Sequence, residues 1–310
     1  MVNDDDETML PIEVVAAVIR DSDGKILIAQ RPANKHQGGK WEFPGGKVEK
    51  GESRRSALIR ELNEELDIEI GHSTRLISVY HEYEDKAVYL DVYDVCQWQG
   101  TAVGKEGQAV KWVSPSALDD FEFPAANRSI LTAAVLPRKL KMLGSATDAS
   151  EYKQNFITQI ELGHRLFLQV FDEKSESFKL YQDNVNWLLD TAASNQVAIV
   201  FEAPPPLVRS DYGIHLSSDE LLTIQEKPVA SYVSASCSTP EELFKAQRLA
   251  LDYVLIGPVL MGNADGKKPI GWPMFQSLSS RVNIPVYAYG GVGAKDIDLA
   301  REYGAQGIVS

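Results

Sequence analysis

The chain has 310 residues, 44% of them hydrophobic, and a net charge of −13. This length favours two domains, and this composition is typical of globular proteins. The acidic balance argues against nucleic-acid partners, and the lack of a run of about 18 apolar residues argues against a membrane span. The acidic N-terminus does not look like a secretory signal, and the two cysteines, Cys96 and Cys237, lie far apart. We therefore expect a cytoplasmic protein without a disulfide framework.

Short strands and a few helices are expected in the first 137 residues. Runs of β-branched and aromatic residues between turn residues indicate the strands. Helical periodicity is clear over Glu52–Leu66 and again over Asn127–Val135. This order predicts an α+β fold, a mixed sheet with flanking helices. The expected strands are Val14–Arg20, Lys25–Gln30, Trp41–Phe43, Leu76–Tyr83, Val88–Trp98 and Gln108–Val113.

Strands and helices alternate regularly after Pro137. Regular alternation indicates a parallel sheet, and the number of units favours a closed (β/α)8 TIM barrel. We place the boundary within Leu136–Ala149 and the domains at 1–137 and 138–310. Because the sequence ends inside the last expected strand, we expect a further helix in a longer product. The expected strands are Leu166–Val170, Ala198–Phe201, Gly213–Leu216, Ser231–Ala235, Tyr253–Ile256, Val286–Tyr289 and Gly307–Ser310.

Three glutamates stand out in the helix predicted over Glu52–Leu66. Glu61, Glu64 and Glu65 are spaced i, i+3, i+4, so a helix places them on one face. Their mutual repulsion is relieved by a divalent cation, and an all-oxygen ligand set favours Mg²⁺ or Mn²⁺. The alternative is a solvated surface helix with salt bridges, which is the common origin of a glutamate-rich segment.

The longer pattern around these glutamates separates the two interpretations. The segment Gly46–Glu65 reads G-x5-E-x7-R-E-U-x-E-E, where U is apolar, directly after Phe-Pro-Gly. It resembles the Nudix box, a specific motif. The family's glycine is replaced by Asp67, and Ile68 keeps the apolar position that follows it. Aspartate tolerates the left-handed backbone conformation better than most residues, so we expect the replacement to have little effect.

Three further segments sharpen the resemblance toward the MutT-type 8-oxo-dGTP diphosphatases. They are Lys40–Glu52, Gly104–Gln108 and Phe123–Asn127. The resemblance implies a reaction in which water attacks a phosphorus of a nucleoside triphosphate, releasing the monophosphate and pyrophosphate. Metal ions would orient the water and neutralise the phosphate charge.

The same resemblance implies roles for individual residues. The expected metal ligands are Glu61, Glu64, Glu65, Glu106 and the Gly45 carbonyl. Glu61 or Glu106 would accept the proton from water, Arg60 would hold the glutamates in position, and Glu52 would support them. The positions expected to contact substrate are Arg31, His36, Glu42, Phe43, Pro44, Gly45, Lys47 and Asn127.

Asn127 is the residue expected to read the purine edge, because an amide both donates and accepts. The alternative for Asn127 is a helix N-cap, and for Phe43 a core aromatic. Together these residues lead to the hypothesis of metal-dependent hydrolysis of oxidised purine nucleoside triphosphates. The products would be 8-oxo-dGMP and pyrophosphate, and the role would be nucleotide-pool sanitation and faithful DNA replication. A thiamine-pathway pyrophosphate is the alternative substrate.

The second half resembles thiamine phosphate synthase and its TenI-type relatives. Gly213–Leu216, Tyr253–Val259 and Ile284–Gly291 carry this resemblance. It implies a phosphate site at Gly290, Gly291 and Ser310, which would bind a thiamine-related phosphate.

Other positions of the second half depart from the synthase pattern. Phe171 stands where the family has an arginine, and the metal-pyrophosphate pair is replaced near Glu202. We therefore expect a vestigial, regulatory or ligand-binding barrel rather than a synthase, with a bifunctional enzyme as the alternative. The structural alternative for His215 is a packed strand residue, and for Cys237 a small buried apolar one.

Overall fold

The computed structural model describes the chain except at residues 1–9, 35–36, 145–147, 171–176, 203–210 and 263–265, and omits the side chains of 177–181. The chain forms two compact units, one ending at Val135 and one beginning at Leu136. The division lies close to the expected boundary at residue 137. No helix of the described residues is long and apolar enough to cross a membrane.

The N-terminal unit contains three small sheets. The largest has the order β4-β1-β7-β6, in which β1 and β7 are parallel and the other pairs are antiparallel. This confirms a mixed sheet. The other two sheets have the orders β3-β2-β9 and β5-β8. The strands are β1 (Ile12–Ile19), β2 (Ile26–Gln30), β3 (Trp41–Glu42), β4 (Gly45–Lys47), β5 (Ile68–Ile70), β6 (Ser73–Glu82), β7 (Ala87–Val95), β8 (Trp98–Gly100) and β9 (Val110–Val113).

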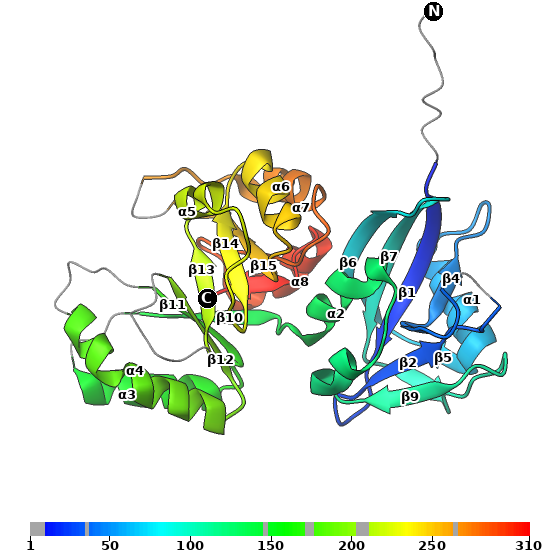
Figure 1. Ribbon diagram of the computed structural model, residues 1–310, viewed down its shortest axis with the longest axis horizontal. Coiled ribbons are helices and arrows are strands. Elements are labelled where there is room, and N and C mark those ends of the chain that lie inside the picture. The colour runs from blue at the N-terminus through cyan, green and yellow to red at the C-terminus, as the bar shows by residue number, and fades with distance from the viewer. Residues whose placement is uncertain (1–9, 35–36, 145–147, 171–176, 203–210, 263–265) are drawn as a thin grey trace, which may run out of the picture. The chain divides into compact units, whose positions relative to one another are not determined.

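Helix α1 (Arg54–Leu66) packs on β1 and β4, as Figure 1 shows. Its apolar positions Ala57, Leu58, Leu62 and Leu66 recur at helical spacing and are buried, so the opposite face is left for charged residues. The helix begins after Ser53, whose hydroxyl accepts a hydrogen bond from the Ser56 N–H. The remaining helical segments of this unit are η1 (Pro115–Asp120), η2 (Ala125–Asn127) and α2 (Arg128–Val135).

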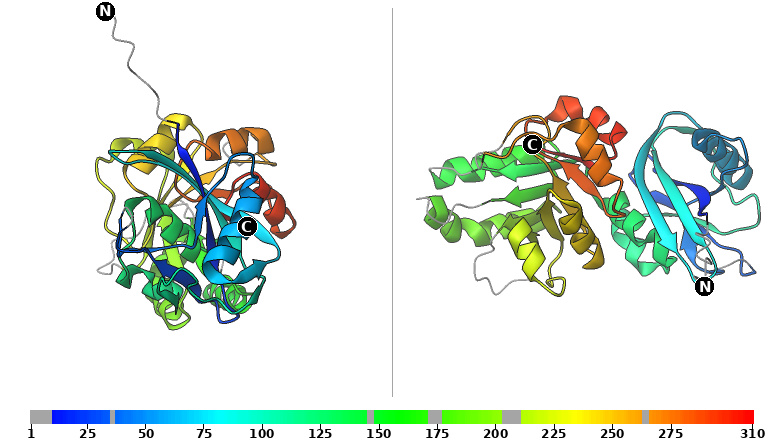
Figure 2. Two further views of the ribbon diagram at one scale, coloured as in Figure 1. Left: turned by 90° about the vertical axis from the view of Figure 1, so that its right-hand side faces the viewer. Right: turned by 90° about the horizontal axis from the view of Figure 1, so that it is seen from above.

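The C-terminal unit is a closed barrel of eight parallel strands paired in chain order, as predicted. Its helices lie outside the strands, and α3 and α4 lie side by side (Figures 1 and 2). The strands are β10 (Lys139–Leu143), β11 (Leu166–Gln169), β12 (Ala198–Glu202), β13 (Gly213–Leu216), β14 (Val233–Cys237), β15 (Tyr253–Ile256), β16 (Val286–Ala288) and β17 (Gly307–Val309). The helical segments are α3 (Ala149–Glu161), α4 (Ser177–Ser194), α5 (Ser218–Thr223), α6 (Pro240–Arg248), α7 (Gly271–Ser279), η3 (Ala294–Asp296) and α8 (Ile297–Glu302).

The segment Leu136–Ala149, in which the boundary is expected, contains strand β10, which was not among the predicted strands. This strand pairs with both β11 and β17 and thereby closes the barrel. Lysines alternate with apolar residues along it, and Leu140 and Leu143 are buried while Lys139 is exposed. The two lysines made the segment look like a polar connection.

Candidate active site

A pocket of about 480 Å³ lies in the N-terminal unit at the carboxyl half of α1. Its lining contains four carboxylates, three cations and two amides, and the remaining residues are mostly apolar. This combination of apolar walls and few polar groups is typical of small-molecule sites. The lining residues are Ile12, Val14, Val15, Ala16, Arg31, Gln37, Glu42, Phe43, Gly45, Gly46, Lys47, Glu61, Glu65, Tyr83, Lys86, Val88, Leu90, Glu106, Pro124, Ala126 and Asn127.

Four carboxylates from three separate segments reach this pocket: Glu42, Glu61, Glu65 and Glu106. The predicted ligand Glu64 is not among the lining residues, and its side chain is 57% exposed. Helical geometry explains the difference, since Glu64 and Glu65 point about 100° apart around the axis. The structure therefore brings Glu61 and Glu65 together with Glu106 and places Glu64 toward the solvent.

Glu65 lies in the most unfavourable electrostatic position of the group. Burial, together with the negative charges of Glu42, Glu61 and Glu106, raises the pKa of Glu65 to about 8. A hydrogen bond from the Gly45 N–H, at 3.2 Å, opposes this effect. The site thus holds more negative charge than its own cations balance.

Arg60 is the centre of the ion pairs on α1. Its guanidinium donates to both oxygens of Glu52, to Glu61 at 2.8 Å and to Glu64 at 3.2 Å. It also donates to the Lys47 carbonyl at 3.0 Å. The hydrogen bonds from Arg60 lower the pKa of Glu52. These contacts agree with the expected role of Arg60 in orienting the glutamates.

Gly46 is required where β4 passes the helix. A β-carbon at this position would lie 2.3 Å from the carboxylate carbon of Glu61. Any side chain here would push the Glu61 carboxylate away, which explains the second glycine of the Phe-Pro-Gly-Gly turn.

The donor set fits a divalent cation chemically, because it consists of carboxylates and surplus negative charge. Among the described residues, however, no three acidic, imidazole or thiol side chains are already arranged as a metal cluster. Arg60 explains part of this, because it holds Glu61 and Glu64. The carboxylates at the pocket would have to turn toward one point to bind a metal ion.

Most of the residues expected to contact substrate line the pocket. Arg31, Glu42, Phe43, Gly45 and Lys47 line the pocket, and Arg31 forms an ion pair with Glu42. Phe43 is buried with its ring 5.6 Å from that of Phe123, so it also serves the core.

Two other residues of the expected set are Pro44 and His36. Pro44 is not among the lining residues, and its carbonyl accepts a hydrogen bond from the Ala17 N–H. His36 lies outside the described residues.

Asn127 also lines the pocket. It is the last residue of η2 and is only 7% exposed. Burial of an amide is unfavourable unless its donors and acceptors are bonded, so a partner in the pocket is favourable.

Comparison with known proteins agrees with this geometry. Residues 15–133 match the NUDIX domain family, and residues 191–310 match thiamine monophosphate synthase. The CTP pyrophosphohydrolase of Escherichia coli (strain K12) is 45% identical over 125 residues, covering 40% of this chain and 92% of that enzyme. The chain belongs to the Nudix family. Its N-terminal unit is a Nudix hydrolase domain, and its C-terminal unit is a barrel of the thiamine phosphate synthase and TenI type.

Other relatives of the Nudix domain are named 8-oxo-dGTP diphosphatase. The 8-oxo-dGTP diphosphatase of Escherichia coli (strain K12) is 36% identical over 123 residues, covering 40% of this chain and 95% of that enzyme. A solved structure of MutT, from work on Aliivibrio salmonicida and Vibrio cholerae, is 37% identical. It covers 40% of this chain and 97% of that chain, with a TM-score of 0.36.

Sequence reasoning missed several lining residues of the Nudix pocket. Tyr83 and Lys86 stand on either side of the turn between β6 and β7, with the Lys86 ammonium 5.9 Å from the Tyr83 ring centroid. Val88 and Leu90 alternate along β7 and form part of the apolar wall. Strand alternation could have identified the last two, but the reach of the turn residues required the structure.

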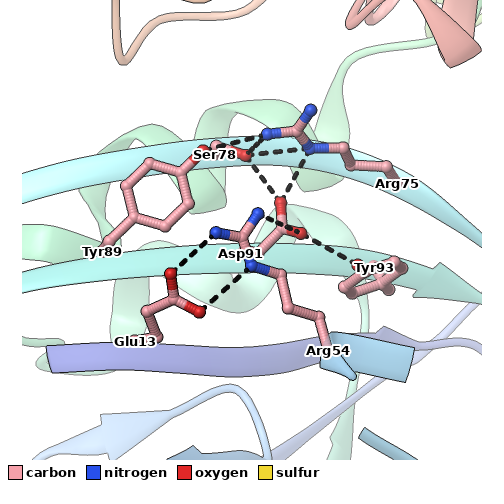
Figure 3. Close-up of polar contacts among 7 residues, drawn as sticks. All are labelled: Glu13, Arg54, Arg75, Ser78, Tyr89, Asp91 and Tyr93. Carbon is pink, nitrogen blue, oxygen red and sulfur yellow. Dashed lines mark hydrogen bonds and ion pairs between the residues drawn. The ribbon is translucent and has the colours of Figure 1, made fainter. Parts of the chain in front are cut away.

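The first turn of α1 is anchored to the sheet by a second polar cluster (Figure 3). Arg54 pairs with Glu13 at 3.1 Å and lies 3.7 Å from the buried carboxylate of Asp91. Asp91 also accepts hydrogen bonds from Arg75 and from the Tyr93 hydroxyl. These contacts fix the start of the helix whose far end carries Glu61 and Glu65.

The predicted barrel site is only partly formed by the described residues. Gly290 and Gly291 follow β16, and Ser310 follows the neighbouring strand β17. The Ser310 N–H donates to the Leu140 carbonyl within the barrel, so this N–H is already engaged. The Gly290 carbonyl accepts hydrogen bonds from two N–H groups of the 260–261 segment.

The surroundings of His215 and Cys237 agree with the structural alternative for each. The two nitrogens of His215 lie 2.8 and 2.9 Å from the hydroxyls of Ser234 and Ser236. Burial lowers the pKa of His215 to about 4, so the ring is neutral at physiological pH. Cys237 is buried in the apolar layer outside the strands, and burial raises the pKa of its thiol.

Proposed function

We propose that the Nudix domain hydrolyses 8-oxo-dGTP to 8-oxo-dGMP and pyrophosphate with Mg²⁺ or Mn²⁺, clearing oxidised guanine nucleotides from the cytoplasmic pool. The observation that carries the proposal is the composition of one pocket. The carboxylates of Glu61, Glu65 and Glu106 line the same pocket as Asn127 and the apolar residues Ala126 and Pro124. The MutT-like relatives support the same substrate, since one is named an 8-oxo-dGTP diphosphatase.

Different residues of the pocket have different roles in the proposed hydrolysis. Bound metal would neutralise the phosphate charge and lower the pKa of the attacking water. Glu61 or Glu106 accepts the proton of that water as the new oxygen–phosphorus bond forms and the bond to pyrophosphate breaks. Arg60 keeps Glu61 oriented, and Lys47, at the pocket, is suited to contact the phosphate chain.

Base recognition depends on Asn127. Its amide can donate to one atom and accept from another on the base edge, and it lies in a mostly buried setting. A ligand that fails to pair with a buried amide leaves that group unsatisfied, which disfavours the wrong base.

A second candidate is hydrolysis of CTP. It is favoured by one observation, the 45% identity to an enzyme named CTP pyrophosphohydrolase. The Nudix chemistry and the roles of the carboxylates would be the same, and only the base at Asn127 would differ.

The two candidates are separated by comparing kcat/KM for 8-oxo-dGTP, dGTP and CTP with Mg²⁺. We expect 8-oxo-dGTP to be preferred over dGTP by at least about 100-fold, as hydrogen-bond recognition allows. Equal turnover of 8-oxo-dGTP and dGTP would refute the proposed specificity, and a preference for CTP would establish the second candidate. Detection of pyrophosphate, rather than orthophosphate, checks which bond is broken.

For the barrel we propose ligand binding without thiamine phosphate synthesis. Gln169 lies two residues before the position at which the synthase family has an arginine. It is buried, and its Oε1 accepts a hydrogen bond from the Tyr152 hydroxyl at 2.7 Å. Calorimetric titration with thiamine phosphate tests binding, and an assay for thiamine phosphate formation tests the bifunctional alternative.

A further inference from the structure

The loop that carries Glu106 is bound to the carboxyl end of α1. The Val103 N–H donates to the Leu66 carbonyl at 3.1 Å, and the Lys105 N–H donates to the Glu65 carbonyl at 2.9 Å. The last carbonyls of a helix have no partner within the helix, so these bonds satisfy groups that would otherwise need water. The end of the Nudix helix and the Glu106 loop therefore form one hydrogen-bonded unit.

The side chain of Gln108 completes this unit. Its Nε2 donates to the Glu65 carbonyl at 3.0 Å, and its Oε1 accepts from the Glu106 N–H at 2.8 Å. Only one orientation of the amide satisfies both contacts, because a flipped amide would oppose donor to donor and acceptor to acceptor. A single planar group thus connects the backbones of two residues whose carboxylates line the pocket.

The loop is compact enough to make this bridge specific. A β-carbon at Gly104 would lie 2.0 Å from the Gln108 carbonyl oxygen, so the chain closes tightly between these two positions. The close approach explains why position 104 is a glycine, and the amide bridge explains why position 108 is a glutamine.

We propose that Gln108 is a positioning residue, whose amide holds Glu106 in register with Glu65 for hydrolysis. Gln108 is not among the described residues that line the pocket, so it acts through the residues that it bridges. The inference rests on the proposed Nudix hydrolysis but is independent of the base that the pocket selects.

The test replaces Gln108 with a residue of the same shape and the wrong hydrogen-bonding groups. Gln108→Glu removes the donor to the Glu65 carbonyl and places a carboxylate oxygen there. Gln97→Glu, at an exposed position of the same domain, introduces the same charge change as a matched control. Both full-length variants are assayed with Mg²⁺ on the nucleotide that the unmodified protein hydrolyses best.

We expect Gln108→Glu to lower kcat about 10- to 100-fold, the usual effect of losing a residue that orients a ligand, while KM changes by less than about threefold. Hydrogen exchange of the metal-free protein should accelerate in the peptide containing residues 103–108. Gln97→Glu should match the unmodified protein in both measurements. The exchange measurement needs no substrate, so it tests the bridge even if the proposed hydrolysis is wrong.

The residual activity of the Glu106→Gln variant, with and without Gln108→Glu, tests whether Gln108 acts through Glu106. In Glu106→Gln, adding Gln108→Glu should lower kcat by less than about threefold, since residues acting as a unit are not additive. A full second loss would overturn the proposal, as would unchanged kcat or unchanged exchange in the single variant. If Gln108→Glu does not fold, Gln108→Met, which lacks both hydrogen bonds, is judged by the same criteria per folded molecule.

Discussion

Glu65 in the Nudix domain and His215 in the barrel are both largely buried, but their surroundings differ. Glu65 lies near the charges of Glu42, Glu61 and Glu106, and its pKa rises to about 8. His215 lies between the hydroxyls of Ser234 and Ser236, and its pKa falls to about 4. Burial favours the neutral form of each side chain.

The difference supports the proposal that the carboxylates of the Nudix pocket bind a cation, and it gives His215 a structural role. The carboxylates of the Nudix pocket retain an electrostatic cost that a cation would remove, whereas the imidazole of the barrel already has two hydrogen-bond partners. Perturbed titration is common at functional sites, but structural groups are perturbed as well. The neighbours of the group, rather than the size of its pKa shift, distinguish the two regions here.

The largest effect is expected from removing the charge of Glu65. Glu65→Gln should lower kcat by about 1,000-fold, because a bound metal contributes several kcal/mol to such reactions. The barrel variant His215→Gln should retain hydrolysis within about twofold, since its neighbours are structural. Steady-state kinetics with Mg²⁺ measure both. Full activity in Glu65→Gln would contradict the metal assignment.

The stability of the metal-free Nudix domain should fall as the pH rises. The folded pKa of Glu65 is raised from 4.5 to about 8, so the folded state holds this proton more tightly than the unfolded state. The stabilisation is complete below pH 4.5 and is lost as the pH rises to about 8, with a magnitude of about 4 kcal/mol.

Urea unfolding of the full chain with a chelator measures this loss. Other carboxylates titrate as well, so the quantity to compare is the free energy of unfolding of the unmodified protein minus that of Glu65→Gln. This difference should decrease between pH 5 and pH 8. A difference that is constant over this range would show that Glu65 is ionised normally in the metal-free fold.

The barrel should respond to pH in the opposite direction. The folded pKa of His215 is lowered from 6.5 to about 4, so the unfolded state binds the proton more tightly. The contribution of the neutral His215 ring to the free energy of unfolding is complete above pH 6.5. It falls by about 2–3 kcal/mol as the pH drops to 4.

The unfolding transition of the barrel, followed by its own peptides in hydrogen exchange, should show this loss. In His215→Gln the loss between pH 6.5 and pH 4 should be smaller by the same amount. If the barrel of the unmodified protein is equally stable at both pH values, the contrast between the two regions is wrong.

Much of this molecule could be predicted from periodicity and spacing. Regular alternation of strands and helices indicated the barrel, and the fixed offsets of the Nudix box indicated α1 and its carboxylates. Strand β10 was missed because its alternating lysines resemble a polar linker. Short strands with charged outer faces are the elements for which composition misleads.

The site was predicted less completely than the fold. Spacing on a helix cannot separate Glu64 from Glu65, because their difference depends on where the sheet and the loops lie around the axis. The pocket walls at Tyr83 and Lys86, and the bridge at Gln108, arise from contacts between segments distant in the sequence. Such contacts follow from tertiary packing, which no local pattern contains.

Substitution of Asn127 should have a moderate effect, limited to the selectivity of the enzyme for the base. Asn127→Ala should reduce kcat/KM for the preferred base about 10- to 100-fold, as expected when hydrogen bonds worth 1–3 kcal/mol are lost. The rate with a nucleotide that does not use the amide should change little. Asn127→Asp keeps the size but removes the donor, so it should lose the same preference. Unchanged discrimination in both variants would return Asn127 to a structural role.

The smallest effect is expected at the position where this chain departs from the Nudix box. Asp67 ends α1 with φ 58°, in the left-handed region, and its carboxylate pairs with Lys105 at 2.8 Å. Asp67→Gly removes backbone strain of about 1 kcal/mol but also removes an exposed ion pair worth about 0–1 kcal/mol. The two changes nearly cancel, so stability measured by urea unfolding should shift by less than about 1 kcal/mol.

Lys105→Ala separates the two contributions at Asp67, because it removes the ion pair and keeps the backbone unchanged. It should destabilise by no more than about 1 kcal/mol, while the hydrogen bond from the Lys105 N–H to the Glu65 carbonyl remains. Hydrogen exchange of residues 103–108 should therefore accelerate far less than in Gln108→Glu. If Lys105→Ala accelerates it equally, the surface ion pair, and not the Gln108 amide bridge, holds the Glu106 loop on the Nudix helix.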